Sequence, residues 1–315
     1  MNGREDETVA TLLRLAGPRP AVPEERAARA RVAVHEAWRE AVRARRRRRV
    51  FVLTGAATLA ASLAFVDLPR ILAPPPGPKV AAPKVATVER ALPGAPLPQG
   101  RTLFAGDTVE TGRGRLALRT TGDVSLRLDE GTSLRLLGTS RVALAAGALY
   151  LDAAPGRSGF VVETPLGPVT DEGTQFEGRL TAGGLRLRVR EGRVTLHGSG
   201  GAERVAAGEE LRAEDGRFER ARVDTTGPEW AWVEGLARAP AIEGRSLRGF
   251  LEWAARERGL TLRFADDDAR ASAERVRLRG SIEGLTPSEA LEAVLPTTGL
   301  RARIEGPSLR LEQAR

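Results

Sequence analysis

Residues 185–196 read LRLRVREGRVTL: apolar side chains alternate with arginines, the chain turns at Glu191-Gly192, and Val194 and Leu196 resume the alternation. A period of two residues places apolar side chains on one face of a strand and charged ones on the other. Glycine supplies the positive φ angle of a tight turn. This stretch therefore predicts a half-buried β-hairpin.

The same alternation covers the middle of the chain, from Leu103 to about Val223. The alternating apolar residues are Leu116 and Leu118; Val124, Leu126 and Leu128; Leu134 and Leu136; Val142 and Leu144; Leu149 and Leu151. Glycines separate these runs, at Gly114, Gly122, Gly131, Gly138 and Gly147. Short strands joined by tight turns predict an all-β domain over 101–226, either a sandwich or an elongated stack of short strands.

A different pattern opens the chain. Arg45 to Arg49 are consecutive arginines, and the 17 residues at 50–66 carry no charge. At about 1.5 Å per residue, a helix of that length covers most of a hydrocarbon core about 30 Å thick. Because arginine-rich flanks stay in the cytoplasm, we expect a transmembrane helix at 50–66, residues 1–49 cytoplasmic and 67–315 exported.

Two alternatives remain for this apolar run. It could be a cleaved secretion signal, although 49 residues is a long leader and no small-x-small cleavage site follows. The residues from Arg48 to Val52 also loosely resemble a twin-arginine export signal. A buried core helix is disfavoured, because an arginine run and a proline run flank the segment.

Charge and composition exclude several classes of function. Residues 1–49 hold 13 arginines and seven acidic residues, a net +6 of the chain's +8, so the sequence pI of about 11.0 reflects this head and predicts no direct nucleic-acid binding. The chain has no cysteine, which excludes a lipoprotein anchor and a Cys/His zinc site. Its two histidines, His35 and His197, are far apart, which disfavours a Ser-His-Asp triad. We expect no enzyme activity, no cofactor and no metal.

The sequence of the head (1–49) predicts two helices separated by prolines. Apolar residues at helical spacing form its candidate partner-binding surface: Leu12, Leu13, Leu15, Val34, Trp38 and Val42. The head could be a helical hairpin packed on itself around Trp38. It could equally complete its core on another protein.

Two further segments complete the organisation. Residues 67–100 are proline-rich, which predicts an extended spacer. Beyond Gly227-Pro228 the period changes, and residues 227–315 predict a compact α+β module of two strand–helix–strand units (βαβ-βαβ). Its expected helices begin at Ser246 and at the capping sequence starting with Thr286, and a strand is expected at 275–282.

The segments 160–177, 188–194 and 207–211, in this order, resemble the FecR family of bacterial sigma-factor regulators. The resemblance is carried by a T-P-x-G turn, a G-T-x-F turn, V-x-E-G-x-V and A-G-E. The residues that mark these turns are Pro165, Gly167, Gly173, Thr174, Phe176, Glu191, Gly192 and Gly208. We expect them to be structural, with Phe176 in the core, Gly173 and Gly192 at positive φ, and the Thr174 and Asp171 side chains bonded to nearby backbone. The segment 227–315 similarly resembles the small domain that precedes secretins and TonB-dependent receptors.

The resemblance implies a function that depends on binding. It implies a single-pass regulator in the bacterial inner membrane, with an extracytoplasmic-function sigma factor as its cytoplasmic partner and an outer-membrane receptor or secretin as a periplasmic partner. The alternative is an envelope scaffold that docks a secretin, a receptor or a polysaccharide, with the head serving only as an anchor.

Overall fold

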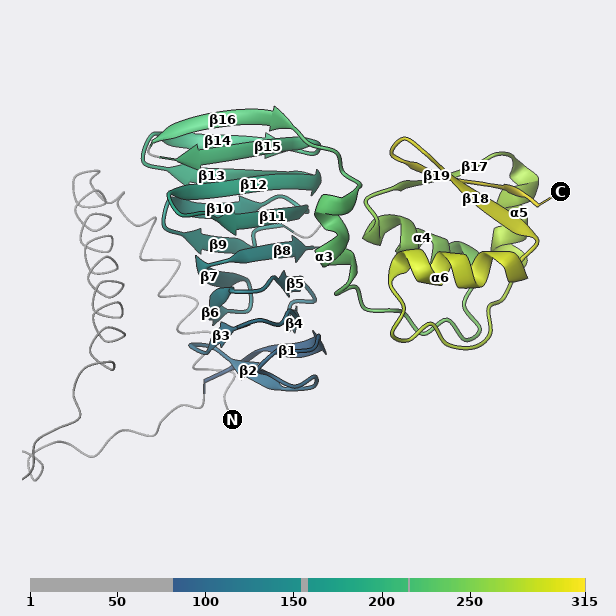
Figure 1. Ribbon diagram of the computed structural model, residues 1–315, viewed down its shortest axis with the longest axis horizontal. Coiled ribbons are helices and arrows are strands. Elements are labelled where there is room, and N and C mark those ends of the chain that lie inside the picture. The colour runs from purple at the N-terminus through teal and green to yellow at the C-terminus, as the bar shows by residue number, and fades with distance from the viewer. Residues whose placement is uncertain (1–81, 154–157, 215, 315) are drawn as a thin grey trace, which may run out of the picture. The chain divides into compact units, whose positions relative to one another are not determined.

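The computed structural model describes residues 82–153, 158–214 and 216–314. They form a two-sheet β-structure followed by a smaller module of helices and strands (Figure 1). The predicted cytoplasmic head (1–49) and the apolar run at 50–66 lie outside the described residues. Within the described ranges, no helix has the length and apolar character needed to cross a bilayer.

Two sheets make up the β-structure of the described residues. The nine-stranded sheet contains β1 (Lys84–Ala91), β2 (Thr102–Phe104), β4 (Leu116–Thr120), β5 (Ser125–Leu128), β8 (Ala148–Asp152), β11 (Gln175–Leu180), β12 (Gly184–Glu191), β15 (Glu209–Glu214) and β16 (Arg217–Arg222). The seven-stranded sheet contains β3 (Thr108–Glu110), β6 (Ser133–Gly138), β7 (Arg141–Ala146), β9 (Val161–Thr164), β10 (Gly167–Asp171), β13 (Arg193–Gly198) and β14 (Gly201–Ala206).

The chain alternates between the two sheets as it proceeds. It adds one or two strands to one sheet, crosses to the other, and returns, so that the strands from β3 onward rise in sequence order within each sheet, while β2 lies at the edge outside β1 (Figure 1). Strands β7 and β9 are parallel because β8 lies between them in sequence and belongs to the opposite sheet. The predicted all-β domain is confirmed. The two predicted alternatives, a sandwich and an elongated stack of short strands, describe the same structure, because the strands of both facing sheets are added progressively along the chain.

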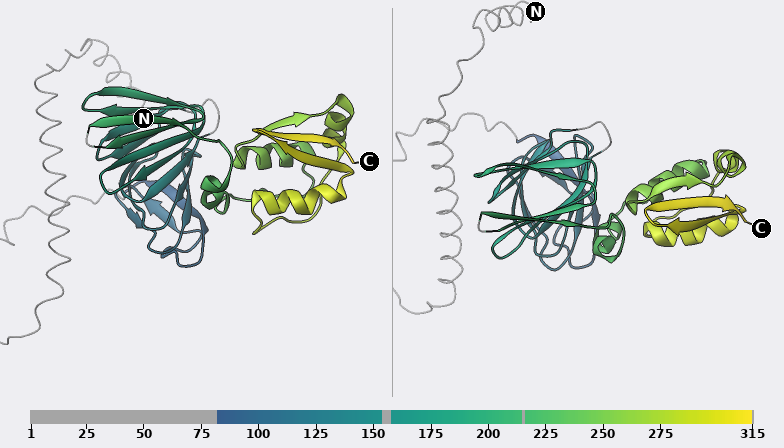
Figure 2. Two further views of the ribbon diagram at one scale, coloured as in Figure 1. Left: turned by 45° about the horizontal axis from the view of Figure 1, so that its top comes forward. Right: turned by 90° about the horizontal axis from the view of Figure 1, so that it is seen from above.

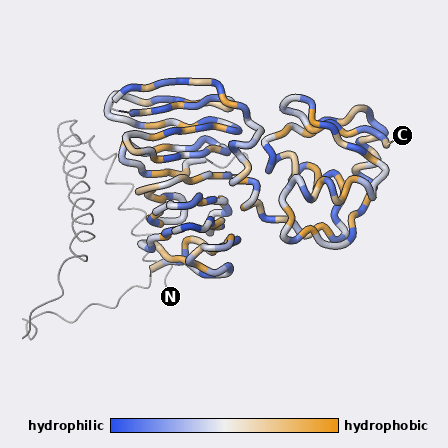
Figure 3. The backbone as a smooth tube through the Cα atoms, in the orientation of Figure 1, coloured by the Kyte–Doolittle hydropathy of each residue, from blue (hydrophilic) through white to orange (hydrophobic). Residues whose placement is uncertain are grey.

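One hydrophobic core lies between the two sheets. Leu128 and Val189 contribute to it from the nine-stranded sheet, and Val169 and Leu196 from the seven-stranded sheet. Apolar and polar residues alternate along the strands, as Figure 3 shows. The period of two therefore correctly identified the face of each strand that is buried.

The predicted spacer of 67–100 is wrong in its second half, since β1 occupies Lys84–Ala91. Val85, Ala86 and Val88 are buried in the sandwich core, and β1 pairs with β2 and β4. The run 84–92 contains no proline. High proline content averaged over the whole segment concealed this proline-free strand.

The C-terminal module differs in element order from the expected βαβ-βαβ. Its elements are η2 (Pro228–Trp230), α3 (Ala231–Glu234), α4 (Leu247–Glu257), β17 (Thr261–Phe264), α5 (Asp267–Arg275), α6 (Pro287–Val294), η3 (Leu295–Thr297), β18 (Leu300–Glu305) and β19 (Ser308–Gln313). The three described strands form a sheet in the order β17-β19-β18. Helices α4 and α6 lie on one side of it (Figures 1 and 2).

The strand expected at 275–282 is also wrong. Leu278 and Ile282 are buried, but the described pairing of this segment is a single bridge between Ser246 and Arg277. Helix α5 was not expected; it starts at Asp266, whose side chain accepts a hydrogen bond from the Ala269 N–H at 2.7 Å. An alternation of apolar and polar residues indicates which side of an extended segment is buried. It does not indicate whether a second strand pairs with that segment.

Candidate functional site

Most of the turn residues singled out in the sequence lie where the chain crosses between sheets. Gly173, Gly192 and Gly208 sit at three such crossings, each at a φ of 76° or 77°. At Gly192 a Cβ would lie 2.6 Å from the carbonyl oxygen of Gly173, so the crossings pack too closely for a side chain. The positive φ expected at Gly173 and Gly192 is therefore present, and the same conformation occurs at Gly208.

The remaining turn residues are also structural. Pro165 lies in the loop between β9 and β10, and a Cβ on Gly167 would meet the His197 carbonyl oxygen at 2.1 Å. Phe176 is buried in the core. Asp171 accepts hydrogen bonds from the N–H groups of Phe160 and Gly173, at 2.5 and 3.0 Å.

Thr174 departs from expectation. Its Oγ1 is buried and makes no hydrogen bond among the described residues, so the expected side-chain bond to nearby backbone is wrong. The Thr174 carbonyl does accept the Ala153 N–H at 3.1 Å. Thr174 therefore contributes to the crossing through its methyl group, which packs close to Gly192, and through its backbone carbonyl.

The junction between the sandwich and the C-terminal module contains an aromatic contact. Tyr150 of β8 faces away from the sandwich core, and its ring lies 5.9 Å from that of Trp230 in an edge-to-face arrangement. Val233 of α3 completes this small apolar cluster. The Trp230 indole N–H donates to the Asp224 carbonyl at 2.9 Å. This cluster is small, so most of the junction is polar.

A buried ion pair lies beside the cluster. Arg127 of β5 donates to the Glu257 carboxylate at the end of α4, at 2.6 Å, and to the Val233 carbonyl at 2.9 Å. The side chains of Arg127 and Glu257 are 3% and 11% exposed. The guanidinium also lies 5.5 Å from the Tyr150 ring centroid. A charge buried this deeply is tolerated because it is paired and hydrogen-bonded.

Arg190 of β12 makes the second buried charged contact. It donates to the carbonyls of Thr225 and Glu257, at 2.6 and 2.9 Å, and to the Glu234 carboxylate at 3.2 Å. Its guanidinium stacks 5.0 Å from the Trp230 ring centroid. Because the Glu257 carbonyl is at the C-terminal end of α4, Arg190 also interacts favourably with the negative end of the helix dipole.

Arg256 of α4 extends from the C-terminal module toward the sandwich. Its guanidinium donates to Glu191 at 2.7 Å and to Asp152 at 2.5 Å, both in the nine-stranded sheet. Gly259 follows with a φ of 65°, and a Cβ there would lie 2.1 Å from Arg190 Nε and 2.2 Å from the Thr225 carbonyl oxygen. Glu191, predicted only as a turn residue, therefore also holds the module.

Burial changes the ionisation of these groups. Burial raises the pKa of the Tyr150 hydroxyl well above its usual range, so the ring stays neutral. Burial also raises the pKa of Glu234, against the opposing effect of Arg190. For Arg127, burial is the largest single influence and opposes the charged form, but Glu257, Tyr150 and Asp152 together outweigh it and raise the pKa of the guanidinium. Arg127 is therefore charged at every physiological pH.

Comparison with known proteins identifies much of the sandwich. Residues 107–195 match the model of the family described as FecR protein. This part of the chain is a FecR domain. The match extends from β3 into β13, so the resemblance expected from the turn motifs is confirmed over these residues. No curated protein sequence matches the chain significantly.

Two solved structures are similar to this chain at a low level. Both are crystal structures of a candidate anti-sigma factor from Parabacteroides distasonis, each 17% identical with a TM-score of 0.37. Each similarity covers 66% of this chain and 98% or 99% of the other. A TM-score of this size is too low to support a common fold. The predicted likeness of the C-terminal module to secretin- and TonB-associated domains stays a prediction.

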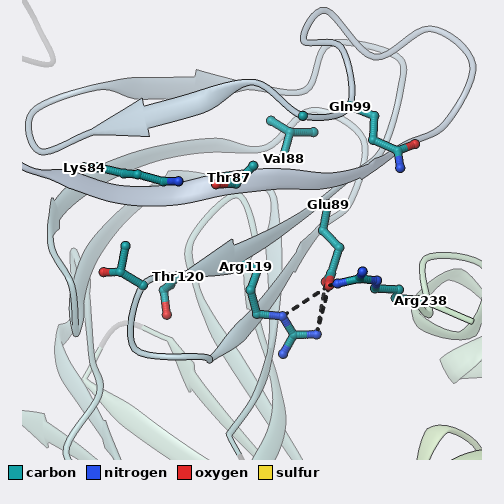
Figure 4. Close-up of a pocket in the computed structure, with 10 residues that line it drawn as sticks. Lys84, Thr87, Val88, Glu89, Gln99, Arg119, Thr120 and Arg238 are labelled. Atoms are coloured by element: carbon teal, nitrogen blue, oxygen red, sulfur yellow. Dashed lines mark hydrogen bonds and ion pairs between the residues drawn. The ribbon is translucent and has the colours of Figure 1, made fainter. Parts of the chain in front are cut away.

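A pocket of about 410 Å³ opens at the β1 end of the structure, lined partly by β1 and partly by residues 119–121 of the FecR domain (Figure 4). Its central carboxylate, Glu89, pairs with Arg119 at 3.1 Å and with Arg238 at 2.9 Å. Arg238 belongs to the segment between α3 and α4, so this pairing also ties the C-terminal module to the sandwich. The charged groups at its centre are already satisfied.

The described residues at the junction are joined by ion pairs, hydrogen bonds and one aromatic contact. They contain no group of three acidic or histidine side chains able to hold a metal ion. The junction residues Arg127, Tyr150 and Glu257 were missed in the sequence, because an outward-facing arginine in an alternating strand is usually solvated. The six head residues (Leu12, Leu13, Leu15, Val34, Trp38, Val42) lie outside the described residues.

Proposed function

We propose that this chain is a single-pass inner-membrane regulator that transmits an envelope signal to an extracytoplasmic-function sigma factor by binding. The match of residues 107–195 to the FecR family carries the proposal. The order of segments supports it: an arginine-flanked apolar run at 50–66 separates the head (1–49) from the FecR domain. In this topology the head is cytoplasmic and the FecR domain and C-terminal module are periplasmic.

The mechanism is a difference in affinity between states. The head binds one conformation of the sigma factor more tightly, and an event at the exported domains changes how available the head is. The junction supports this arrangement, because a polar, ion-paired contact joins the sandwich and the module. An outer-membrane receptor or a secretin is the proposed partner of the exported part.

Co-purification tests the proposal. The full-length chain, tagged and extracted in detergent, is co-expressed with each sigma factor of the source genome, beside a variant lacking residues 1–49. We expect one sigma factor to co-purify stoichiometrically with the full-length chain and not with the truncated one. Absence of any complex would favour the envelope scaffold.

The head surface can then be tested at one residue. Trp38→Ala should weaken sigma binding by more than ~1 kcal/mol, as expected for a buried aromatic anchor. Isothermal titration with the co-purifying sigma factor measures the change. Unchanged affinity would remove Trp38 from the interface.

A further inference from the structure

The three-stranded sheet of the C-terminal module carries a row of arginines on its outer face. Arg263 of β17 lies opposite Arg310 of β19, which lies opposite Arg303 of β18. All three are exposed. The opposite face packs on the helices through Leu262, Phe264, Leu309 and Leu311. The arginine face is therefore uncovered by any described part of the module.

This row is unfavourable for the module alone. Like charges directly opposite each other on neighbouring strands destabilise a sheet, and with strands about 4.8 Å apart Arg310 has a like charge opposite it on each side. Glu312 pairs with Arg301 and Arg303, at 2.7 and 3.1 Å. Glu305 pairs with Arg310 at 3.3 Å.

Arg263 has no such compensation. Its side chain makes no ion pair or hydrogen bond with any of the described residues, and the face as a whole carries four arginines against two glutamates. The net positive charge of this face is therefore left for something outside the module to neutralise.

The composition of the face indicates the kind of partner. Its outward residues are Thr261, Arg263, Arg301, Arg303, Glu305, Ser308, Arg310 and Glu312. The hot spots of protein interfaces are enriched in tryptophan, tyrosine and arginine, and this set contains arginines without any aromatic or large aliphatic side chain. Ile304, although 52% exposed, alternates to the other face opposite Leu309. Guanidinium groups pair bidentately with phosphate, so a flat layer of phosphates fits the face.

We propose that this face contacts the anionic phospholipid headgroups of the membrane that anchors the chain. This proposal rests on the single-pass topology of the proposed function. Basic residues near an anionic lipid surface favour binding to it. At the usual contribution of each charge, the net charge of two on this face raises the fraction of modules in contact with the lipid about 30-fold. The chain between residues 66 and 82 spans at most roughly 55 Å, which keeps the lipid surface at high effective concentration. Weak contacts are sufficient under these conditions.

The lack of cysteine allows a specific test in the full-length chain. Thr261→Cys places the sole thiol on the outer face, on β17. The labelled chain is reconstituted in vesicles of phosphatidylcholine alone or with about 30% phosphatidylglycerol. Because the neutral quencher acrylamide is not concentrated or excluded by surface charge, quenching of the label reports how open the face is.

We expect acrylamide quenching to fall at least about threefold when phosphatidylglycerol is present, and to recover in about 0.5 M salt. Arg263→Glu/Arg303→Glu should abolish the fall. The matched pair Arg217→Glu/Arg222→Glu, on the exposed strand β16, should retain it. Equal quenching in both lipids, or loss of the effect in both pairs, would overturn the proposal and leave the face to an acidic protein. Carbonate extraction of the same vesicles tests the topology separately, and sigma co-purification does not depend on the label.

Discussion

At the scale of single residues, two buried arginines determine how the C-terminal module is held. Arg127 and Arg190 project from the outer face of the nine-stranded sheet. Their guanidinium groups donate hydrogen bonds to carbonyl and carboxylate oxygens of the C-terminal module, including those of Glu257 at the end of α4. The aromatic pair of Tyr150 and Trp230 supplies the apolar part of the contact. Since each buried charge depends on its partner, single substitutions here should have large effects.

Removing one member of the buried pair should destabilise the protein strongly. Arg127→Met leaves Glu257 without its ion-pair partner, and we expect a loss of about 3–5 kcal/mol in the free energy of unfolding. Urea denaturation followed by tryptophan fluorescence measures it. The double variant Arg127→Met/Glu257→Leu should recover most of the loss, since it removes both charges. Equal losses in the single and double variants would contradict this account.

Substitution of Gly259 should lower the stability of the protein for two separable reasons, its positive φ and the close approach of neighbouring atoms. Gly259→Ala places a Cβ against Arg190 and the Thr225 carbonyl oxygen and also forces alanine to a φ of 65°. Gly244→Ala is the matched control, because Gly244 has a φ of 72° and a Cβ added there would meet nothing within 4 Å. The control should cost about 1 kcal/mol, and Gly259→Ala distinctly more, in denaturant unfolding. Similar costs would show that the close approach relaxes easily.

At the scale of elements, neighbouring strands of the sandwich carry complementary charges on their outer face. Glu210 of β15 is buried between Arg188 of β12, with which it forms an ion pair, and Arg212, at 2.7 Å. Burial alone would raise the pKa of Glu210, but the two arginines lower it below its usual value. The pairing therefore stabilises the strand contact only while Glu210 is ionised.

The sign of the pH dependence follows from this lowered pKa. The contribution of Glu210 is fully present above the unfolded pKa of a glutamate, about 4.3, and is lost as the pH falls through the folded value. Glu210→Gln should therefore destabilise the chain at about pH 7 and differ little from the natural chain at about pH 3. Guanidinium unfolding at the two pH values measures the difference. An equal effect at both would show that the ion pairs are not responsible.

Helix α6 begins with the capping box expected from the sequence. The Thr286 side chain accepts the Glu289 N–H, and the Glu289 carboxylate accepts the Thr286 N–H. Thr286→Ala should cost about 1 kcal/mol of unfolding free energy. Ser288→Ala, one position before Glu289 and outside the box, is the control and should be nearly neutral. Calorimetric unfolding of the two variants makes the comparison.

At the scale of the whole described structure, the sandwich and the C-terminal module have separate hydrophobic cores joined through a mostly polar junction. Polar interfaces between domains permit relative motion more readily than apolar ones. The junction is therefore where the two parts are most free to move relative to each other.

Loss of Arg190 should release the module without unfolding the sandwich. Arg190→Met removes the bonds to Thr225, Glu234 and Glu257, and we expect faster limited proteolysis between residues 224 and 246, with the FecR domain remaining resistant. Arg212→Met, on the same sheet face but outside the junction, should show the cleavage rate of the natural chain. Mass spectrometry of the fragments identifies the sites. Simultaneous loss of both parts would indicate a single cooperative unit.

The sequence alone determined which residues of the sandwich are buried and where its chain turns. Period-two alternation depends only on local geometry, and the glycines at 173, 192 and 208 mark conformations that other residues rarely adopt. Likewise, the first residues of α4 and α6 were predicted because capping is local.

Only the tertiary structure decided how these elements are partnered. The alternation between two sheets and the placement of strand β1 inside a proline-rich stretch both depend on contacts distant in sequence. The junction is the clearest case, because Arg127 and Glu257 are separated by 130 residues. An arginine in an alternating strand reads as solvated until another part of the chain covers it, and that covering is decided by long-range packing, which no local pattern records.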